Sequence, residues 1–545
     1  DDMPDWVGAE WWPIRPNTDT ALMLALAQEV VRAGHHDRDF LDRCTSGSAM
    51  YLDYLAGRSD GVEKTAGWAE AITGIPADAI RALALRLAGT RSYLTASWAL
   101  QRAHHGEQPY WAAIGLASVL GQIGLPGGGV GFGIGSLAGV GAPFAVAQGP
   151  ALSQGAKALD RFIPVARITD LLTRPGEPFE YEGRTHTYPD TRLVYWAGGN
   201  PFHHHQDLNR FAEAWKRPET VVVQDPMWTA TALRADIVLP ASPSLERNDI
   251  AGNRRSAVVI AMQQAIAPVG EARSDYAILT ALAQRFGVED AFTEGRDEMG
   301  WIRHLYEGVR QDAAARFDHA MPEFETFWAE GRAAVPMRED NVYLADYRAD
   351  PAAHPLRTES GRIVLGSRQL VDLGYDDCLP HPAWLPPLEW LGGGRPGLHL
   401  MSRQPEGRLH SQLEQGKASL GTKRAGREAM QIHPEDAAAR GIADGQTVRL
   451  WNDRGACIAT AVLTADLRPG VVVLPTGAWY TPDGPGGMDL AGNPNVLTPD
   501  IPSSTLGQGC SAHTCMVEVE PYSINRPEAA AIYAEALARL VPGGD

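Results

Sequence analysis

The sequence predicts a multidomain α/β protein that ends in a small β-rich domain. Over the first 330 residues, short β-branched or aromatic runs alternate with segments of helical periodicity, which is the pattern of strands joined by crossover helices. From about residue 430, strand-like runs follow one another with little more than turns between them. The 545 residues, of which 44% are hydrophobic and 21% charged, suffice for about three or four domains with buried cores.

The charge, the apolar runs and the cysteines of the chain limit the kinds of partner that it can bind. The chain carries 48 basic and 66 acidic residues, a net charge of −18 at pH 7. This charge argues against a nucleic-acid partner or an anionic membrane surface, so local groups must hold any bound polyanion. No apolar run reaches the ~18 residues of a transmembrane helix, so we expect no membrane insertion. The five cysteines form no Cys-x-x-Cys pair and show no zinc or iron–sulfur spacing.

The segment of residues 1–160 is expected to be an α/β region that carries polar residues at two places. Asn17-Thr18-Asp19 precedes an apolar helical pattern over 20–34, and Asp19 complements the dipole of that helix. Further along, Trp98 and Arg102 lie four residues apart. In a helix they would share one face, where a core tryptophan and a structural ion pair are the simplest interpretation.

Residues 127–135 are rich in glycine but do not match a phosphate-binding loop. A dinucleotide fingerprint needs its glycines after a strand and before a helix, whereas this run follows Leu-Pro after a helix. We therefore expect a flexible connection here. The Pro-rich, irregular residues 341–395 are expected to form a second connection, a linker between domains.

The most informative segment is a strand that ends in two glycines. Residues 193–197 are apolar and aromatic, and Gly198-Gly199 leads into Asn200, Pro201 and three histidines where the next helix begins. In open α/β sheets, ligands bind at the carboxyl ends of the strands. Glycine lets a ligand approach the backbone, and the helix start offers free N–H groups to anions. Adjacent histidines do not favour a zinc site because their side chains diverge, so hydrogen bonds to phosphates or to the domain's own loops fit better.

Two more strands in the same region reinforce this interpretation. Residues 220–225 are β-branched and end in Gln224 and Asp225, and residues 235–240 form the next apolar run. Acidic side chains at strand ends commonly bind ribose hydroxyls. Together with Asn200, they predict a Rossmann-like parallel-sheet domain over 161–340 that binds a large, dinucleotide-like ligand.

Residues 396–545 are expected to form the β-rich domain. A short helix with a glycine turn is predicted over 432–445, and three strands follow between 447 and 474. A polar, turn-prone run precedes them, and loop-stabilising hydrogen bonds are the alternative to a ligand-binding role for it. The side-chain donors of this run are Ser402, Arg403, Gln404, Arg408, His410, Ser411 and Gln412. Pro405 lies within the same run.

Taken in order, these motifs resemble the molybdopterin oxidoreductases of the dimethyl sulfoxide reductase family. Within it, the run 193–210 is most similar to the biotin sulfoxide and trimethylamine N-oxide reductases. The residues Leu245–Asp249 and Glu271–Asp275 also match family segments. The resemblance implies a molybdenum ion held by two molybdopterin guanine dinucleotides and a C-terminal barrel of double-psi type that closes over this cofactor. It also implies reduction of a small S-oxide or N-oxide (biotin or methionine sulfoxide, dimethyl sulfoxide, trimethylamine N-oxide) with electrons from an unidentified donor.

The same resemblance implies roles for individual residues. Those expected to bind nucleotide moieties are Asn17, Asp19, Asn200, His204, Gln224, Asp225, Arg247 and Asp275. Those expected nearer the pterins and the metal are Trp98, Arg102, Ser402, His410, Ser411, Gln412, Asn495 and Gln508. Further cofactor contacts are expected from Thr18, Ala99, Arg403, Gln404, Pro405, Arg408 and Gly509. Trp98, Arg102 and His410 are the expected catalytic residues.

One family feature has no counterpart in this chain. Family members carry the serine that ligates the metal in an N-terminal region that the sequence does not contain, so no metal ligand is expected here. We expect the chain to be a piece of a longer enzyme, with a separate polypeptide as the less favoured explanation. Two alternatives stay open: a cofactor-binding fragment without turnover, and a nicotinamide or flavin dehydrogenase. The sequence leaves the compartment open between cytoplasm and periplasm.

Overall fold

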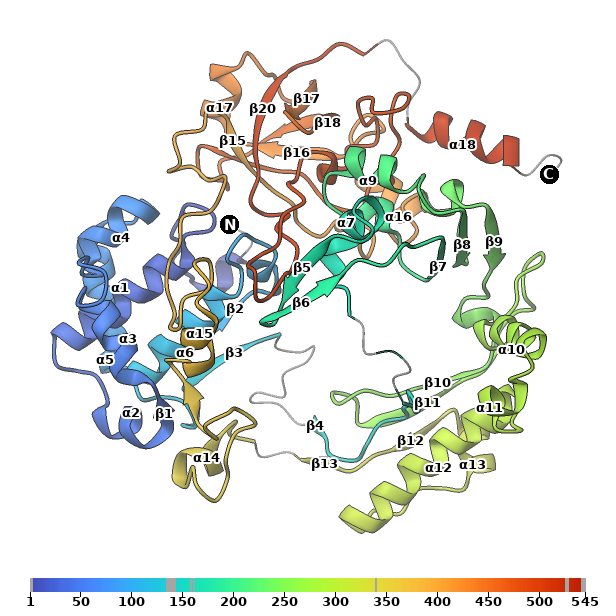
Figure 1. The fold of residues 1–545 in the computed structure, drawn as a ribbon, viewed down its shortest axis with the longest axis horizontal. Coiled ribbons are helices and arrows are strands. Elements are labelled where there is room, and N and C mark those ends of the chain that lie inside the picture. The colour runs from blue at the N-terminus through green and yellow to red at the C-terminus, as the bar shows by residue number, and fades with distance from the viewer. Residues whose placement is uncertain are drawn as a thin grey trace.

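The computed structural model describes residues 3–133, 144–156, 159, 162–338, 341–524 and 529–540. Figure 1 shows the helices of the first part on the left, the barrel at the top and the parallel strands β7, β8 and β9 on the right. A further group of helices, α10–α13, lies on the opposite side from the first part. The mixed α/β architecture that the sequence predicts is confirmed.

The first part is built around an apolar helix. Helix α1 (Asp19–Arg32) packs against α4 (Ala66–Thr73), α5 (Ala77–Gly89) and α6 (Gln108–Val119). Leu24 and Leu116 are buried in their shared core. The short helices α2 (Arg38–Cys44) and α3 (Ser48–Leu55) complete this part.

A two-stranded parallel sheet continues from these helices. Strand β2 (Tyr93–Ala96) pairs with β3 (Gly129–Phe132). The expectation of a flexible connection over 127–135 is therefore wrong for residues 129–132, because their backbone groups pair with those of β2. Residues 134 and 135 lie outside the described residues.

The central sheet has the predicted parallel topology. Strands β7 (Leu193–Ala197), β8 (Thr220–Asp225) and β9 (Ile237–Pro240) lie in the order β7-β8-β9, all parallel. The register places Ala197 opposite Gln224 and Asp225 opposite Pro240, so the three strands end at one edge. Nearby lie α7 (Ile168–Thr173), α8 (Pro201–His204), α9 (Leu208–Ala214), β5 (Pro178–Tyr181) and β6 (Arg184–Thr187).

The part beyond the central sheet combines helices with an antiparallel sheet of the order β10-β11-β12. Tyr306 and Phe327 stack in its core with ring centroids 4.0 Å apart. The elements are β10 (Asp249–Ala251), β11 (Val258–Met262), β12 (Arg332–Ala334), α10 (Asp275–Phe286), α11 (Glu289–Thr293), α12 (Glu298–Phe317) and α13 (Phe324–Glu330). A small pair, β4 (Phe144–Ala145) and β13 (Met337–Arg338), lies beside them.

The C-terminal part is a closed barrel, as the sequence predicts. Its six strands follow one another around the barrel in the order β15-β19-β16-β18-β17-β20, with parallel pairs β15·β19 and β16·β18. The strands are β15 (Leu398–Met401), β16 (Ala429–Ile432), β17 (Thr447–Asn452), β18 (Gly455–Leu463), β19 (Val471–Val473) and β20 (Met516–Pro521). Helices α16 (Lys417–Thr422), α17 (Pro434–Ala439) and α18 (Ala529–Leu540) accompany it. Among the described helices, none is long and apolar enough to cross a membrane.

Residues 341–395 are largely irregular, yet they are anchored at both ends. They contain α14 (Ala345–Ala349), β14 (Ile363–Val364) and α15 (Arg368–Leu373). Strand β14 pairs in parallel with β1 (Thr45–Ser46) of the first part. This segment therefore ties the helical part to the barrel instead of running free.

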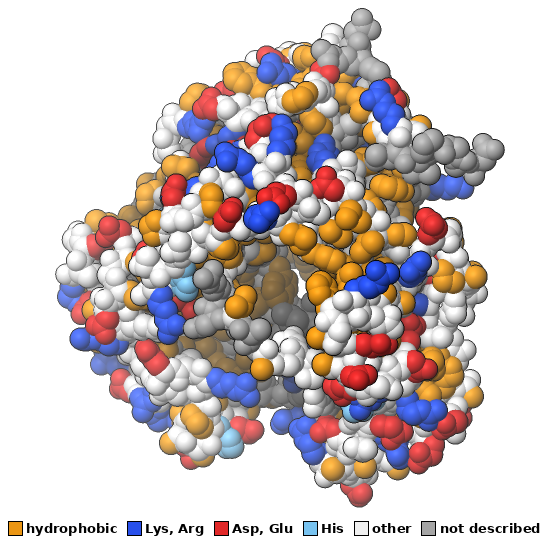
Figure 2. Space-filling model, turned by 45° about the vertical axis from the view of Figure 1, so that its right-hand side comes forward, with side chains coloured by type: hydrophobic (Ala, Val, Ile, Leu, Met, Phe, Trp, Pro, Cys, Tyr) orange, Lys and Arg blue, Asp and Glu red, His pale blue; other side chains and the backbone are white. Residues whose placement is uncertain are grey.

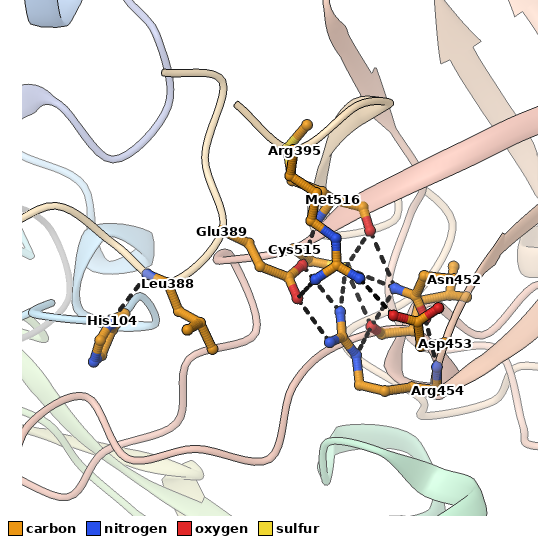
Figure 3. Close-up of polar contacts among 10 residues, drawn as sticks. His104, Leu388, Glu389, Arg395, Asn452, Asp453, Arg454, Cys515 and Met516 are labelled. Atoms are coloured by element: carbon orange, nitrogen blue, oxygen red, sulfur yellow. Dashed lines mark hydrogen bonds and ion pairs between the residues drawn. The ribbon is translucent and has the colours of Figure 1, made fainter. Parts of the chain in front are cut away.

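The attachment to the barrel depends on one buried carboxylate (Figure 3). The Glu389 side chain is 1% exposed, and its two oxygens accept hydrogen bonds from Arg395 (2.7 Å), Arg454 (2.7 and 3.0 Å) and the backbone N–H of Met516 (2.7 Å). Burial alone would raise the pKa of Glu389, but the hydrogen bonds from Arg454 and Met516 hold it below its usual value. This interaction is therefore complete at neutral pH and is lost only as the pH falls through that lowered pKa.

We predict that Glu389→Gln lowers the free energy of unfolding by ~3 kcal/mol at pH 7, because it leaves two guanidinium groups without their buried counter-charge. Urea unfolding monitored by tryptophan fluorescence measures the change. Glu219→Gln is the matched control, since the Arg192–Glu219 pair is 68% and 62% exposed and should contribute less than ~1 kcal/mol. Equal effects of the two substitutions would contradict the prediction.

Candidate functional site

The two glycines after β7 lead into a buried polar position. Gly198 and Gly199 adopt φ of 68° and 79°, a conformation that favours glycine. Asn200, 3% exposed, accepts a hydrogen bond at Oδ1 from Thr231 Oγ1 (2.5 Å). Its Nδ2 donates to Ser411 Oγ (3.4 Å) in the loop that follows β15. Asn200 therefore joins the central sheet to the predicted donor-rich loop.

The ends of β7 and β8 bring three further predicted residues together. Tyr195 donates its hydroxyl to Gln224 Oε1, and Gln224 Nε2 donates to Asp275 Oδ1, both at 2.5 Å. Asp225 is 8% exposed and accepts a hydrogen bond from the backbone of Met227 (2.8 Å). Burial raises the pKa of Asp225 to about 6. The exposed carboxylate of Asp275, the Gln224 amide and the buried Asp225 carboxyl thus lie together at one edge of the sheet, where they could bind ribose or base groups.

His204 and Arg247 lie at the margin of this group. His204 is exposed, with its ring 6.2 Å from that of Trp196. Arg247 forms an ion pair with Asp249. Its Nε is buried and has no hydrogen-bond partner among the described residues.

A buried arginine within the loop of residues 402–412 stabilises its conformation. The Arg408 side chain is fully buried and donates to His410 O (3.2 Å), Ser419 Oγ (2.9 Å) and Glu428 Oε1 (2.9 Å). These contacts give Arg408 a role in shaping the loop. His410 adopts φ of 51° and stays exposed, as do Gln404 and Gln412. Pro405 is buried.

Ser402 links the loop to the turn before β20, whereas Arg403 pairs within the loop. Ser402 O accepts a hydrogen bond from His513 Nε2 (3.1 Å). Arg403 Nη2 donates to Glu406 (3.0 Å), whereas Arg403 Nε is buried without a partner among the described residues.

The segment with Trp98, Ala99 and Arg102 faces this loop from the first part, but not as an α-helix. Residues Trp98–Gln101 form a 3₁₀ turn, and Arg102 ends it with φ −89° and ψ 45°. The expectation that a helix would align Trp98 with Arg102 is therefore wrong, because the turn closes before the four-residue repeat is reached. The expected ion pair is also not observed in the described structure, where Arg102 Nε is buried without a hydrogen-bond partner.

Arg102 nevertheless lies where the barrel, the central sheet and the first part meet. Burial and the nearby Arg102 charge together lower the pKa of His410 and bring that of His513 to about 3. The backbone N–H of His513 donates to Arg102 O (2.8 Å). Both imidazoles are therefore neutral at pH 7 and can accept as well as donate hydrogen bonds.

Asn17, Thr18 and Asp19 join the same region through the barrel's last turn. Asn17 Oδ1 accepts a hydrogen bond from Thr514 Oγ1 (3.1 Å), which also accepts the backbone N–H of His104 (2.9 Å). Thr18 is fully buried and donates to Arg15 O (2.6 Å). Burial raises the pKa of Asp19, the first residue of α1.

The predicted residues near the C-terminus lie on two separate turns. Asn495, 4% exposed, donates from Nδ2 to His203 O (2.6 Å) and so reaches α8. Gln508 adopts φ of 49° and donates to the backbone carbonyls of Thr505 (3.2 Å) and Glu180. Gly509 N donates to Ser503 Oγ (2.9 Å).

Two histidines that the sequence did not single out also belong to the site. The His203 ring is buried, lies 6.3 Å from the His410 ring, and has an Nδ1 without a partner among the described residues. Its place in the triplet of histidines was the available signal. His513 carries no signal in the sequence, because only the fold brings it to Ser402.

Hydrogen bonds join the first part, the central sheet, the loop of residues 402–412 and the turns before β20 at this site. Buried Nε atoms of Arg102, Arg247 and Arg403 lack acceptors in the described protein, and a buried unpaired donor is costly. Such donors suit an elongated anionic ligand with hydrogen-bonding heads. Among the described residues, no group of three or more His, Cys, Asp or Glu side chains could hold a metal ion by itself.

Comparison with known proteins agrees with this geometry. A family model described as molybdopterin oxidoreductase matches residues 7–285, and one described as a molybdopterin dinucleotide binding domain matches residues 398–516. A biotin sulfoxide reductase of Cereibacter sphaeroides is 65% identical over 543 residues, covering 99% of this chain and 73% of that protein. A dimethyl sulfoxide/trimethylamine N-oxide reductase of the same organism is 46% identical, covering 95% of this chain and 65% of that protein.

A solved structure agrees at the level of the fold. The acetylene hydratase from Pelobacter acetylenicus superposes with a TM-score of 0.70 and 17% sequence identity, covering 96% of this chain and 73% of that one. At this identity the likeness shows the fold alone.

The raised pKa of Asp225 predicts how the free energy of unfolding of the cofactor-free protein depends on pH. Because burial raises that pKa from 3.8 to about 6, the Asp225 carboxyl lowers the stability of the fold progressively between these two pH values, and the full loss is present above about pH 6. Asp225→Asn should therefore raise the free energy of unfolding at pH 8 by up to ~3 kcal/mol. The difference should vanish near pH 4. Urea unfolding at the two pH values measures it, and a substitution effect that is independent of pH would contradict the assignment.

Proposed function

Because the chain belongs to the molybdopterin oxidoreductase family, we propose that it takes part in the reduction of S-oxides or N-oxides at a molybdenum centre. The activities for which its relatives are named support S-oxides and N-oxides as the substrate class. Candidate substrates are biotin sulfoxide, methionine sulfoxide, dimethyl sulfoxide and trimethylamine N-oxide. The observation that carries the proposal is the set of three buried arginine Nε atoms, on Arg102, Arg247 and Arg403, that lack an acceptor among the described residues.

When bound, the molybdenum ion with its two molybdopterin guanine dinucleotides supplies the two-electron chemistry. The S=O or N–O bond breaks, and the oxygen leaves as water after taking up two protons. The two electrons come from a separate donor, which the sequence and the fold do not identify. The chain's own residues bind the cofactor, orient the substrate and control water and protons around the reacting bond.

The residues present fit this group in their chemistry. Phosphates suit the free Nε donors of Arg247 and Arg403. Carboxylates suit the N–H groups of guanine and the hydroxyls of ribose, which are the roles we propose for Asp19, Asp225 and Asp275. The remaining proposed cofactor contacts are Asn17, Thr18, Ala99, Asn200, His204, Gln224, Ser402, Gln404, Pro405, Arg408, Ser411, Gln412, Asn495, Gln508 and Gly509.

Trp98, Arg102 and His410 are proposed to face the substrate. Trp98 is 42% exposed and packs edge-on against Phe132, with ring centroids 5.3 Å apart. Its exposed face offers an apolar contact to a methyl or alkyl group. His410, which is neutral at pH 7, can accept a hydrogen bond or a proton at a ring nitrogen, and Arg102 can donate to the oxide oxygen.

The direct test is reduction of a panel of oxides by the purified, molybdenum-loaded protein, with a reduced viologen dye as electron donor. The proposal predicts dye oxidation with at least one S-oxide or N-oxide and formation of the matching thioether or amine. Protein stripped of its cofactor is the control. No turnover of any oxide by fully loaded protein would overturn the proposal.

A substitution at Arg102 tests its proposed role as a hydrogen-bond donor to the oxide oxygen of the substrate. Arg102→Met should lower kcat/KM for S-oxides ~10- to 100-fold, the value of one charge-assisted hydrogen bond. Arg102→Lys should recover part of the loss, because it keeps the charge but not the planar guanidinium. Molybdenum content and the thermal midpoint are measured on each variant. Unchanged kcat/KM in fully loaded Arg102→Met would contradict a role at the substrate.

A further inference from the structure

Four charged side chains are buried together between the loop of residues 402–412 and strand β16. Figure 2 shows charged side chains of both signs spread over the face of the molecule in view, and the surface is where such groups usually lie. In contrast, the side chains of Arg408, Glu414, Lys423 and Glu428 are 0%, 1%, 6% and 3% exposed. We call these four residues the buried charge cluster.

The cluster holds two cations and two anions, which pair with one another. Glu428 Oε1 accepts a hydrogen bond from Arg408 Nη2 (2.9 Å), and Lys423 Nζ lies 3.5 Å from the same oxygen. Lys423 also forms an ion pair with Glu414. Glu428 is thus the carboxylate that both cations share, and its removal would leave a buried positive charge without its partner.

Stability alone does not account for such a cluster. Moving charged groups from water into the protein costs free energy, and well-packed hydrophobic residues in place of a buried ion pair often give a fold that is as stable or more stable. Buried ion pairs can instead specify one conformation of the chain around them. The contacts of Arg408 indicate which conformation the cluster specifies here.

Arg408 connects the cluster to the loop. Its guanidinium donates to Ser419 Oγ in α16 (2.9 Å), to Thr476 O (3.1 Å) and to His410 O (3.2 Å). Together with Glu428, these acceptors lie on four segments of the chain and fix the planar guanidinium in one orientation. The His410 carbonyl is therefore held by a side chain whose own position depends on Glu428.

His410 needs this support because of its backbone conformation. Its φ of 51° lies in the left-handed region, which residues other than glycine rarely adopt. Its carbonyl oxygen also approaches Gly477 so closely that a Cβ atom there would lie 2.0 Å from it. The next carbonyl, Ser411 O, accepts a hydrogen bond from Trp479 Nε1 (2.9 Å). His410 thus has a strained conformation that depends on the contacts around it.

We propose that Glu428 is a positioning residue of the reaction centre, which acts through Arg408 to hold His410 in the conformation that faces the substrate. The inference rests on the proposed function, in which the neutral His410 ring accepts a hydrogen bond or a proton at a ring nitrogen. A displacement of such a group by ~1 Å lowers a rate by up to ~100-fold. Loss of the Glu428 carboxylate should therefore act mainly on kcat.

Glu428→Gln tests the proposal, because it keeps the size of the side chain and removes its charge. In the molybdenum-loaded enzyme, kcat per molybdenum for the oxide that wild-type enzyme reduces fastest should fall ~10- to 100-fold, while KM changes less than about threefold. Glu428→Asp, which keeps the carboxylate, should retain part of the activity. Glu520→Gln is the matched control in the barrel, since the Arg449–Glu520 pair is 36% and 46% exposed, and it should leave both constants unchanged.

A double variant separates positioning from stability. Glu428→Gln leaves the Arg408 charge unpaired and should lower the thermal midpoint, whereas Arg408→Met combined with Glu428→Leu removes both charges and should restore most of the loss. The proposal predicts that kcat per molybdenum stays low in the double variant, because the His410 carbonyl has lost its donor. Recovery of kcat together with the thermal midpoint, or a loss of activity that a lower molybdenum content fully explains, would overturn the inference.

Hydrogen exchange gives a readout without turnover. In the double variant, the amides of residues 402–412 should exchange ~10-fold faster than in wild-type protein, while those of β17 and β18 exchange as before. If wild-type enzyme reduces no oxide yet this local change is found, the proposed function fails and the control of the loop by Glu428 and Arg408 stands. Unchanged exchange over residues 402–412 would overturn the inference.

Discussion

The apolar core shared by the central sheet and the barrel is the constraint on which the candidate site depends. Phe211 and Trp215 on the sheet side belong to the same buried cluster as Leu400, Leu450 and Val472 of the barrel. Burying each such side chain is worth ~1.5–3 kcal/mol, so the two parts are held together strongly. Because both walls of the interior rest on this one core, Asn200 and Ser411 are kept at hydrogen-bonding distance.

Hydrogen bonds from two asparagines beside this core stabilise α8, the short helix that follows Gly198 and Gly199. Helix α8 has four residues, which is too short to pair its own carbonyl groups. Asn493 and Asn495, from the barrel side, donate to the carbonyls of Phe202 (3.3 Å) and His203 (2.6 Å). The barrel thus completes the turn that presents Asn200 and the histidines. Two carbonyl groups of α8 therefore accept their side-chain hydrogen bonds from the barrel side.

Local patterns predicted the central sheet and the barrel because each depends on contacts within short stretches. The β-branched runs, the strand-end residues Gln224 and Asp225, and the three strands between 447 and 474 all appear where periodicity and turn chemistry place them. The turn at Trp98 was mistaken for a helix, since a 3₁₀ turn closed by tertiary contacts has the same spacing in sequence. His513 and Glu389 could not be found in this way, because Ser402 and Arg102 on the one hand, and Arg454 and Met516 on the other, lie far from them along the chain.

The proposed reaction requires the site to hold a molybdenum ion with two molybdopterin guanine dinucleotides. The most direct measurement is the amount of molybdenum and of acid-released guanine nucleotide in the purified natural protein, expressed per polypeptide. We expect about one molybdenum and two guanines per chain. A protein that contains flavin or nicotinamide instead, or that is saturated with molybdenum but releases no guanine nucleotide, would contradict it.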